Sequence, residues 1–582
     1  MRPAFPVRRP SFPAAVLVGA AVLIIVIVGA ACGPSVPENP ADLVLTGGNI
    51  VTMADGASAA QAIAVRGDRI AAVGSDAEIE ALIGPETQVI RLDGKTVVPG
   101  MIDAHVHFTN LGRQRQILNA RGMSKEEIVA EVGRRAAVSP PGDWIEGRGW
   151  DQNTWQVREF PAKADLDGVS PDNPVFLKRI DGHAAWVNSS ALMAASITRD
   201  TLDPAGGQII RDAAGDPTGT LIDNGFRLAE REIPPPSRAQ RRQAVQLAIE
   251  EALASGLTGV HEAGGSREEI EVYLEMLEDD DFDFRLYEFV RWPANEAEQP
   301  HTYDELDYFL EQGPQVGLYD NRLTIRGIKM ISDGAMGSRG AALLEPYADD
   351  PGNTGLSRLS EDEIYGTILR GLEAGFQTAT HAIGDAANRV VLDAFERAIE
   401  ESGVEDHRLR IEHAQILHPD DVGRFAELGV LPSMQPTHAT SDMHWVVDRV
   451  GEQRTTFAYA WRTLLDSGVR MPGGSDAPVE SVRPLWGIYS AVTRQDHDPG
   501  DAAPWHPEQL VTREEALRMF TIDAAYGAFE EDLKGSLEVG KLADMVVLSR
   551  DIMTIAAPEI LETEVLTTIL GGRIVYEATA SQ

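Results

Sequence analysis

The chain has 582 residues, 43% of them hydrophobic and 24% charged, which is the composition of a globular protein able to bury a large core. This excludes a mini-protein, a mainly disordered chain and a collagen-like fibre. The 90 acidic residues against 51 basic ones give a formal net charge of −39, which argues against nucleic acid as a partner because phosphate backbones would be repelled. The single cysteine, Cys32, excludes an internal disulfide.

The N-terminus carries the pattern of an export signal. Arg8 and Arg9 precede Ala14–Ala31, an unbroken run of 18 small or apolar residues, and Cys32 follows at once. This pattern resembles a bacterial lipoprotein signal, in which the cysteine becomes the lipidated first residue after cleavage. An uncleaved membrane anchor and a cleaved signal of a soluble exported protein are the alternatives. All three predict a body outside the cytoplasm, and the lipoprotein interpretation places it at the cell envelope, anchored to the membrane. Residues 1–31 would be the signal or anchor and residues 32–41 a linker.

The two ends of the remaining chain look alike. Residues 42–98 read as short alternating strands broken by glycine turns. Residues 531–582 repeat the pattern, and Leu570–Val575 echoes Leu45–Val51. We therefore expect the two segments to pair in one composite β-sandwich, with coincidental hairpins as the alternative.

Between these ends, residues 99–530 alternate short apolar runs with amphipathic helical patterns, which favours parallel βα units and an α/β fold. The candidate strands are Val98–Ile102, Val175–Arg179, Thr258–His261, Leu323–Met330, Gln377–His381, Arg408–His413, Leu431–Gln435 and Arg470–Gly474. The candidate crossover helices are Arg238–Ala254, Glu361–Ala374, Ala386–Ser402 and Pro419–Leu428. Eight strands in this order predict a closed (β/α)8 barrel of the TIM type. The interval at about 110–240 exceeds one crossover and predicts an inserted subdomain or lid.

Five polar residues fall at the ends of candidate strands. His105 and His107 lie one residue apart after the first strand, so both side chains point to the same face and can chelate one metal. His381, His413 and Asp476 end later strands in the same way. Because barrel chemistry collects at the C-terminal ends of strands, this register favours a site over five separate, satisfied polar residues.

Lys329 stands inside an apolar strand. A buried lysine is costly unless it is paired or neutralised, and it loses its proton readily. A structural ion pair with a neighbour such as Asp333 is one interpretation. The other is a lysine that reacts with carbon dioxide to form a carbamate, an anionic oxygen ligand that can bridge two metals.

The pattern as a whole resembles the amidohydrolase superfamily, and within it the long members of amidohydrolase family 3 that are called YtcJ-like. The resemblance covers nearly everything from about residue 42 to the end. It rests on Pro99–His107, Asp181–Trp186, Lys329 with Asp333–Arg339, His381, Arg410–His413, Gly474–Asp476 and Gly535–Asp544.

This resemblance implies a metal-dependent enzyme that hydrolyses a carbon–nitrogen bond in a small amide-type substrate. His105 and His107 would hold one divalent metal and His381 and His413 a second. Lys329 as carbamate would bridge them, and Asp476 would complete the set. Zinc is the default ion for such a site, with one or two per chain.

Further roles are assigned by position. Asp476 would act as the base towards water and then protonate the leaving nitrogen. His183 is a candidate catalytic, oxyanion-contacting or substrate residue, with a loop-fixing histidine as the alternative. His261 and Trp150 are candidate substrate contacts, and a packing role is the alternative for Trp150. His438 and His444 are expected to have ordinary loop roles, although a substrate contact is conceivable.

Alternatives of other classes remain open at this stage. They are an esterase or carbamate hydrolase on the same site, and a non-catalytic barrel that captures a ligand or metal at the cell surface. A homodimer is compatible with the sequence.

Overall fold

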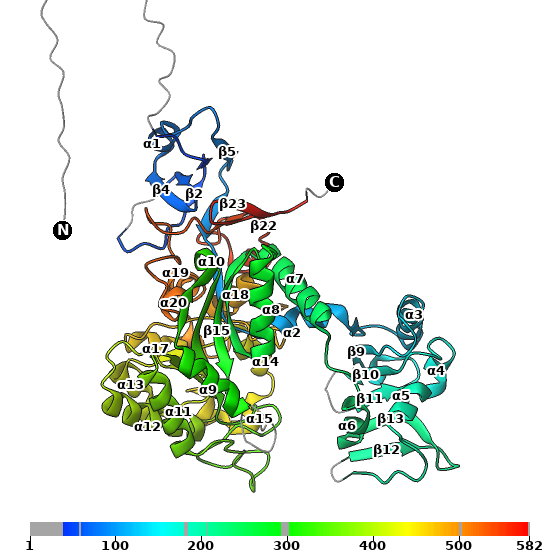
Figure 1. Cartoon of the computed structure of the whole chain (residues 1–582). Helices are drawn as coiled ribbons and strands as arrows, with labels where there is room; N and C mark the ends of the chain where they lie inside the picture. The colour runs from blue at the N-terminus through cyan, green and yellow to red at the C-terminus, as the bar shows by residue number, and fades with distance from the viewer. Residues whose placement is uncertain are drawn as a thin grey trace, which may run out of the picture.

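The computed structural model describes residues 39–56, 60–179, 184–204, 207–292, 302–498, 500 and 503–579. These residues form four β-sheets and the helices around them (Figure 1). Among the helices of the described ranges, none combines the length and the apolar character that a bilayer crossing requires. Cys32 and His183 lie outside the described residues, so lipidation, export and the role of His183 stay predictions.

The largest sheet is a ring of parallel strands with one short antiparallel addition. In spatial order its members are β20 (Leu431–Ser433), β19 (Arg410–His413), β18 (Gln377–Ala382), β17 (Leu323–Ile331), β15 (Arg285–Arg291), β14 (Leu257–Gly265) and β7 (Met101–Val106), with β16 (Gln315–Gly317) beside β17. Residues 472–474 close the ring, because the Gly474 amide donates to the Met434 carbonyl (3.1 Å) and the Ala104 amide donates to the Gly473 carbonyl (2.9 Å). The predicted TIM-like barrel is thereby confirmed, with a short eighth segment.

One predicted barrel strand was wrong. Val175–Arg179 is β10, which pairs with two strands of the insertion, and the barrel uses β15 in its place. Periodicity identifies a strand but does not identify its neighbours. The first predicted strand is also divided at Gly100, where a Cβ would lie 2.2 Å from Thr258 Oγ1, so only glycine allows this close approach of β14.

Helices alternate with the strands of the barrel along the chain. They are α2 (Phe108–Gln116), α7 (Arg238–Ala254), α8 (Arg267–Glu278), α9 (Thr302–Gln312), α10 (Leu318–Asn321), α11 (Glu361–Glu373), α12 (Asp385–Ser402), α13 (Pro419–Leu428), α14 (Pro436–Asp442), α15 (Val446–Val450), α16 (Glu452–Thr455), α17 (Trp461–Asp466), α18 (Pro484–Thr493), η2 (Pro507–Gln509), α19 (Arg513–Met519) and α20 (Ile522–Tyr526). The four predicted crossover helices form α7, α11, α12 and α13. Ser237 and Ser360 begin two of them with capping boxes, and Gly403 and Gly429 end the other two in the left-handed conformation.

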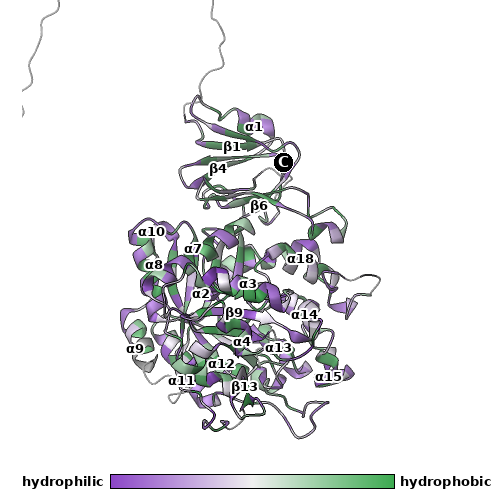
Figure 2. Cartoon of the chain, turned by 90° about the vertical axis from the view of Figure 1, so that its right-hand side faces the viewer, coloured by the Kyte–Doolittle hydropathy of each residue, from purple (hydrophilic) through white to green (hydrophobic). Residues whose placement is uncertain are grey.

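The two chain ends form the predicted composite sandwich. One sheet runs β4 (Arg69–Gly74), β3 (Ala62–Arg66), β1 (Leu43–Thr46) and β5 (Gln88–Arg91), and the other runs β2 (Asn49–Ile50), β6 (Thr96–Pro99), β21 (Met545–Leu548), β22 (Val565–Leu570) and β23 (Arg573–Glu577), with α1 (Asp76–Glu80) and η3 (Ala557–Ile560) alongside. Leu45, Val65, Val547 and Ile569 share one apolar core, so the sheets pack face to face at one end of the molecule (Figure 2). Strand β6 pairs with β21, which joins the two ends of the chain.

The insertion has its own sheet and projects to one side of the barrel (Figure 1). It consists of β8 (Leu118–Asn119), α3 (Lys125–Ala136), β9 (Ile145–Trp150), η1 (Gln152–Thr154), α4 (Lys163–Asp167), β10 (Val175–Arg179), β11 (Ala184–Val187), α5 (Ser189–Ala194), β12 (Gly207–Arg211), β13 (Pro217–Asp223) and α6 (Asn224–Glu230). Trp150, Trp155 and Trp186 pack together in its core, with ring centroids 6.1–6.4 Å apart. This apolar cluster gives the insertion a core separate from that of the barrel.

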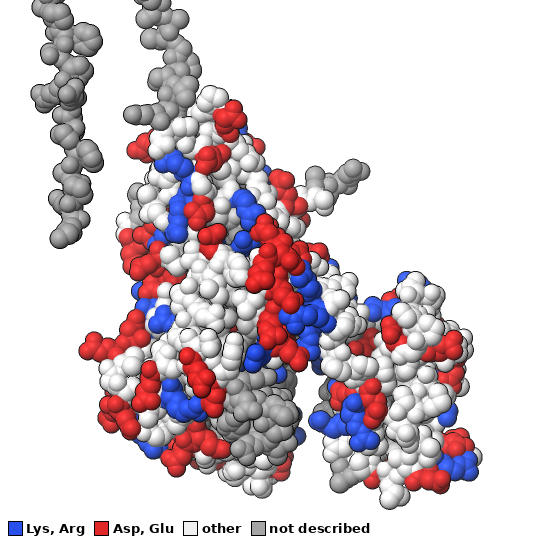
Figure 3. All heavy atoms as spheres, in the orientation of Figure 1, with Lys and Arg blue, Asp and Glu red and all other residues white. Residues whose placement is uncertain are grey.

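Helices α7 and α8 carry paired charges on one outer face. Figure 3 shows acidic and basic side chains in adjacent bands over these helices. Ion pairs on this face include Arg238–Glu275, Arg241–Glu268 and Arg242–Asp279. On this face arginines therefore neutralise part of the acidic charge. Each of these exposed ion pairs contributes little to the stability of the fold.

Candidate metal centre

The described structure brings the six predicted ligand side chains to the C-terminal ends of the barrel strands. They are His105 in β7, His107 at the N-cap of α2, Lys329 in β17, His381 in β18, His413 at the end of β19 and Asp476 after the closing segment 472–474. The parallel register explains the convergence, since strands that run in one direction end on one face of the barrel.

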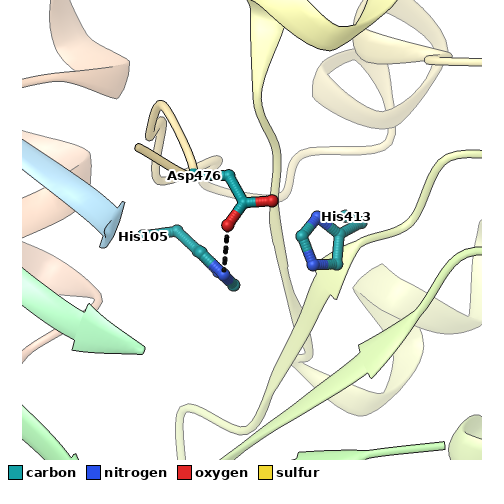
Figure 4. Close-up of side chains that lie close together, drawn as sticks. All are labelled: His105, His413 and Asp476. Carbon is teal, nitrogen blue, oxygen red and sulfur yellow. Dashed lines mark ion pairs between the residues drawn. The ribbon is translucent and has the colours of Figure 1, made fainter. Parts of the chain in front are cut away.

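Asp476 and the two histidines of the first strand form one half of the cluster. Asp476 Oδ1 lies 3.5 Å from His105 Nε2 and 3.4 Å from His107 Nε2. Lys329 Nζ lies 3.3 Å from the same His105 nitrogen. Figure 4 shows His105 and His413 on either side of the Asp476 carboxylate, and ligand atoms of these three buried residues lie within 4.8 Å of one another.

His381 and His413 form the other half. Their ring centroids are 4.5 Å apart, and the His413 ring lies 4.8 Å from that of His105. His381 Nε2 lies 3.3 Å from Asp333 Oδ1. Asp333 also accepts hydrogen bonds from the amides of Ala342, Ile383 and Gly384. Among the contacts of the described residues, Asp333 therefore pairs with His381. The alternative in which Asp333 forms an ion pair with Lys329 is not what the structure shows.

Two site residues hold a backbone conformation that side chains rarely adopt. His413 has φ of +75° and Asp476 has φ of +57°, both in the left-handed region. Such conformations cost of order 1–3 kcal/mol each and persist where the surrounding structure enforces them. His413 is the last residue of β19, so the strand ends where its imidazole reaches the site.

Burial sets the protonation states of the cluster. It lowers the pKa of His105 to about 4, with Lys329 adding to the effect, and it lowers the pKa of Lys329 to about 8. Burial alone would raise the pKa of Asp476, but the adjacent His107 and other imidazoles hold it well below its usual range. At neutral pH the site therefore offers a neutral imidazole, a carboxylate and an amine that loses its proton readily.

These properties fit a divalent metal. Metal ligands must be deprotonated, as His105 and Asp476 are at neutral pH. Asp476 Oδ1 is buried without a hydrogen-bond partner among the described residues, which leaves a carboxylate oxygen available to an ion. Imidazole nitrogen with carboxylate oxygen is a donor set that zinc, manganese, iron and cobalt accept.

A second layer of polar residues, which we did not predict, orients the ligands. Glu412 is buried, accepts a hydrogen bond from Arg410 Nε at 2.8 Å and pairs with Nδ1 of His105. Asp103 accepts hydrogen bonds from the His105 amide at 3.0 Å and from Ser475, and burial raises its pKa to about 7. The sequence did contain a signal for this layer in β19. Arg410 and Glu412 lie two positions apart in a buried strand, so they must share a face and find charged or polar partners there.

The other predicted contacts lie elsewhere. Trp150 is fully buried in the insertion core and donates from Nε1 to the Leu177 carbonyl at 2.6 Å, the position of a packing residue. His261 lies inside the barrel with Nδ1 3.0 Å from Arg410. His444 is exposed and pairs with Asp496 on the surface.

Comparisons with known proteins agree with this geometry. A sequence model of the amidohydrolase family matches residues 88–576. The YtcJ protein of Bacillus subtilis (strain 168) is 35% identical over 539 residues, covering 91% of this chain and 98% of the relative. An N-substituted formamide deformylase of Arthrobacter pascens is 31% identical over 569 residues, covering 93% and 99%. The crystal structure of a metal-dependent hydrolase from Pyrococcus furiosus superposes with a TM-score of 0.73 at 30% identity, covering 88% of this chain and 100% of that one.

Proposed function

This chain belongs to the amidohydrolase family, and on that premise we propose that it hydrolyses a carbon–nitrogen bond in a small amide-type molecule with a metal-activated water. Family membership confirms the expectation of a hydrolase that acts on carbon–nitrogen bonds other than peptide bonds. One observation carries the proposal: neutral imidazole and ionised carboxylate groups from separate strands converge at the barrel mouth.

We assign the metal to the six converging side chains. His105, His107, His381, His413 and Asp476 would supply nitrogen and oxygen ligands, and zinc is the first ion to test. A divalent ion in such a site supplies an acidified water and polarises a carbonyl oxygen. Lys329 would enter as a carbamate: its neutral amine adds to the carbon of carbon dioxide, a nitrogen–carbon bond forms and the nitrogen releases a proton. Its lowered pKa, about 8, favours this step because more of the amine is unprotonated at neutral pH.

Asp476 acts first as the general base and then as the general acid of the reaction. As an ionised carboxylate it accepts a proton from the attacking water, whose oxygen bonds to the carbonyl carbon. It then returns the proton to the leaving nitrogen while the carbon–nitrogen bond breaks. Amide and water become carboxylic acid and amine, so atoms and charge balance.

N-substituted formamides are the first substrates to test. The supporting observation is the deformylase relative, which aligns with nearly the whole of both chains. Longer N-acyl amines, cyclic amides, carbamates and esters complete the panel, because they react through the same carbonyl attack.

Metal content per chain tests the proposal most directly. The purified full chain, prepared with bicarbonate, is analysed for metals before and after Lys329→Ala, with Lys125→Ala as a control at a solvent-accessible lysine of the insertion. We expect one to two zinc-like ions in the wild type and the control, a loss in Lys329→Ala, and metal-dependent turnover of at least one panel member. Metal binding without any turnover would favour a non-catalytic binding barrel, and a chain that takes up no metal would refute the proposal.

A further inference from the structure

A buried histidine that no role yet uses lies next to the cluster. His438 belongs to α14 (Pro436–Asp442), which follows β20, and it is 7% exposed. Its ring lies nearly parallel to that of His413, with centroids 6.0 Å apart and an angle of 16°. Its Nε2 is 3.7 Å from Asp476 Oδ2 and is buried without a hydrogen-bond partner among the described residues. An unpartnered buried nitrogen is costly, and here it faces the reaction site.

The groups around His438 determine which nitrogen carries the proton. Gln415 Nε2, an amide group that can only donate, lies 3.3 Å from His438 Nδ1. Nδ1 must therefore accept, which leaves the proton of the neutral ring on Nε2. The Asp476 carboxylate on the other side favours the same form, because its oxygens attract a donor.

The neighbouring His413 has the opposite arrangement. Its Nδ1 lies 2.8 Å from Oε1 of Gln435, whose own Nε2 donates to the Ser433 carbonyl at 3.2 Å. The amide oxygen of Gln435 therefore faces His413, so Nδ1 donates and the Nε2 lone pair is free. Two adjacent imidazoles thus present different chemistry to the site: His413 a lone pair for a metal, His438 an N–H donor.

Resting on the proposed function, we propose that His438 is a catalytic residue that donates a hydrogen bond from Nε2 to the oxygen of the substrate carbonyl, and that it is not a metal ligand. The donor is held in place before the substrate arrives, so negative charge that develops on that oxygen meets a fixed dipole. Gln415 is a positioning residue, since it acts only through the His438 ring.

Three substitutions test the assignment. His438→Phe keeps a flat ring but removes the donor, while His438→Gln places an amide N–H near the position of Nε2. His444→Gln, at an exposed histidine of the following segment, is the matched control. Each variant is measured for zinc per chain, for turnover of the panel and, loaded with cobalt(II), for the dissociation constant of formate from the visible spectrum.

We expect zinc per chain to stay unchanged in every variant. In His438→Phe formate should bind about 10- to 100-fold more weakly, the effect of one hydrogen bond to a charged group, and kcat should fall at least as much. His438→Gln should recover part of both losses, and His444→Gln should match the wild type. Loss of zinc in His438→Phe would make His438 a ligand and overturn the proposal, as would unchanged formate binding. If the wild type turns over no panel member the proposed function fails, yet the formate titration still decides the role of His438.

Discussion

Arg285 and Asp544 form a buried, bidentate ion pair that links the barrel to the sheet of the C-terminal segment. Arg285 begins β15, and its Nε and Nη2 donate to the two Asp544 oxygens at 2.6 and 2.9 Å. Asp544 directly precedes β21 and also accepts the Gly571 amide at 2.8 Å. Both side chains are at most 5% exposed. The role of this pair is mechanical, because it joins residues 259 positions apart.

Asp544→Asn should therefore destabilise the fold. Removing one partner leaves the Arg285 charge buried and uncompensated, which costs about 3–5 kcal/mol of unfolding free energy. The matched control is Asp283→Asn, because Asp283 pairs with Arg573 of β23 at 2.6 Å across the same junction but on the surface. That pair is solvent-exposed, so its loss should cost less than about 1 kcal/mol. Denaturant unfolding at pH 7 compares the two, and equal losses would contradict the argument.

The same pair predicts an acid dependence of stability. Burial alone would raise the pKa of Asp544, but Arg285 and the Gly571 amide hold it below its usual value. Since the folded pKa lies below the unfolded one of about 3.9, the stabilisation is fully present above that pH and is lost as pH falls through the folded pKa. The difference in melting temperature between wild type and Asp544→Asn should be constant near neutrality and should narrow below about pH 4. A difference that widens in acid would show that the pair does not act this way.

Glu412 should control metal affinity through His105. Its carboxylate pairs with Nδ1 of His105 and is fixed by Arg410, so the His105 Nε2 lone pair points into the site. Partners of this kind change metal affinity about 10- to 100-fold when they are lost. We expect Glu412→Gln to weaken zinc binding by that factor in a competition with a chelator. Unchanged affinity would reduce Glu412 to a structural role.

The site was predictable because it follows from strand direction. His105, His381 and His413 each come at the end of an apolar run, and parallel strands bring such ends together whatever their order in the barrel. The same logic could not tell that β10 belongs to the insertion, because an apolar run gives no information about its neighbour. Strand β15 was missed since charged residues stand at both of its ends and in its middle.

The orienting layer depends on tertiary contacts that a sequence does not contain. Gln415 and Gln435 lie 20 positions apart, and only the fold shows that they meet His438 and His413 with opposite ends of their amides. The sequence left two roles open for Trp150 for a related reason, since an aromatic residue near a barrel serves equally well in a pocket or in a core. Its buried position in the insertion decides for the core.

Asp476→Asn should nearly abolish turnover even where metal is supplied in excess. The amide has nearly the shape of the carboxylate but cannot accept and return a proton, which costs about 10²- to 10⁴-fold in kcat. Because Asp476 also lies among the ligands, kcat must be measured at zinc concentrations that saturate the variant. Ser481→Ala, at a half-buried serine of the segment that follows, serves as a control for the preparation of the variants. Wild-type turnover in saturated Asp476→Asn would remove this residue from proton transfer.

Removing metal should lower both activity and thermal stability. His105, His413 and Asp476 come from three separate segments, so an ion that they share links β7, β19 and the closing segment in the folded state only. A ligand that binds only the folded state stabilises it by about 2.7 kcal/mol when present at about 100 times its dissociation constant. Dialysis against a chelator should therefore lower the melting temperature and stop turnover, and zinc should restore both. Asp544→Asn is the control: it should melt at a lower temperature than the wild type, yet zinc should raise its melting temperature by the same amount. If zinc does not raise the melting temperature of the wild type, no ion joins these segments.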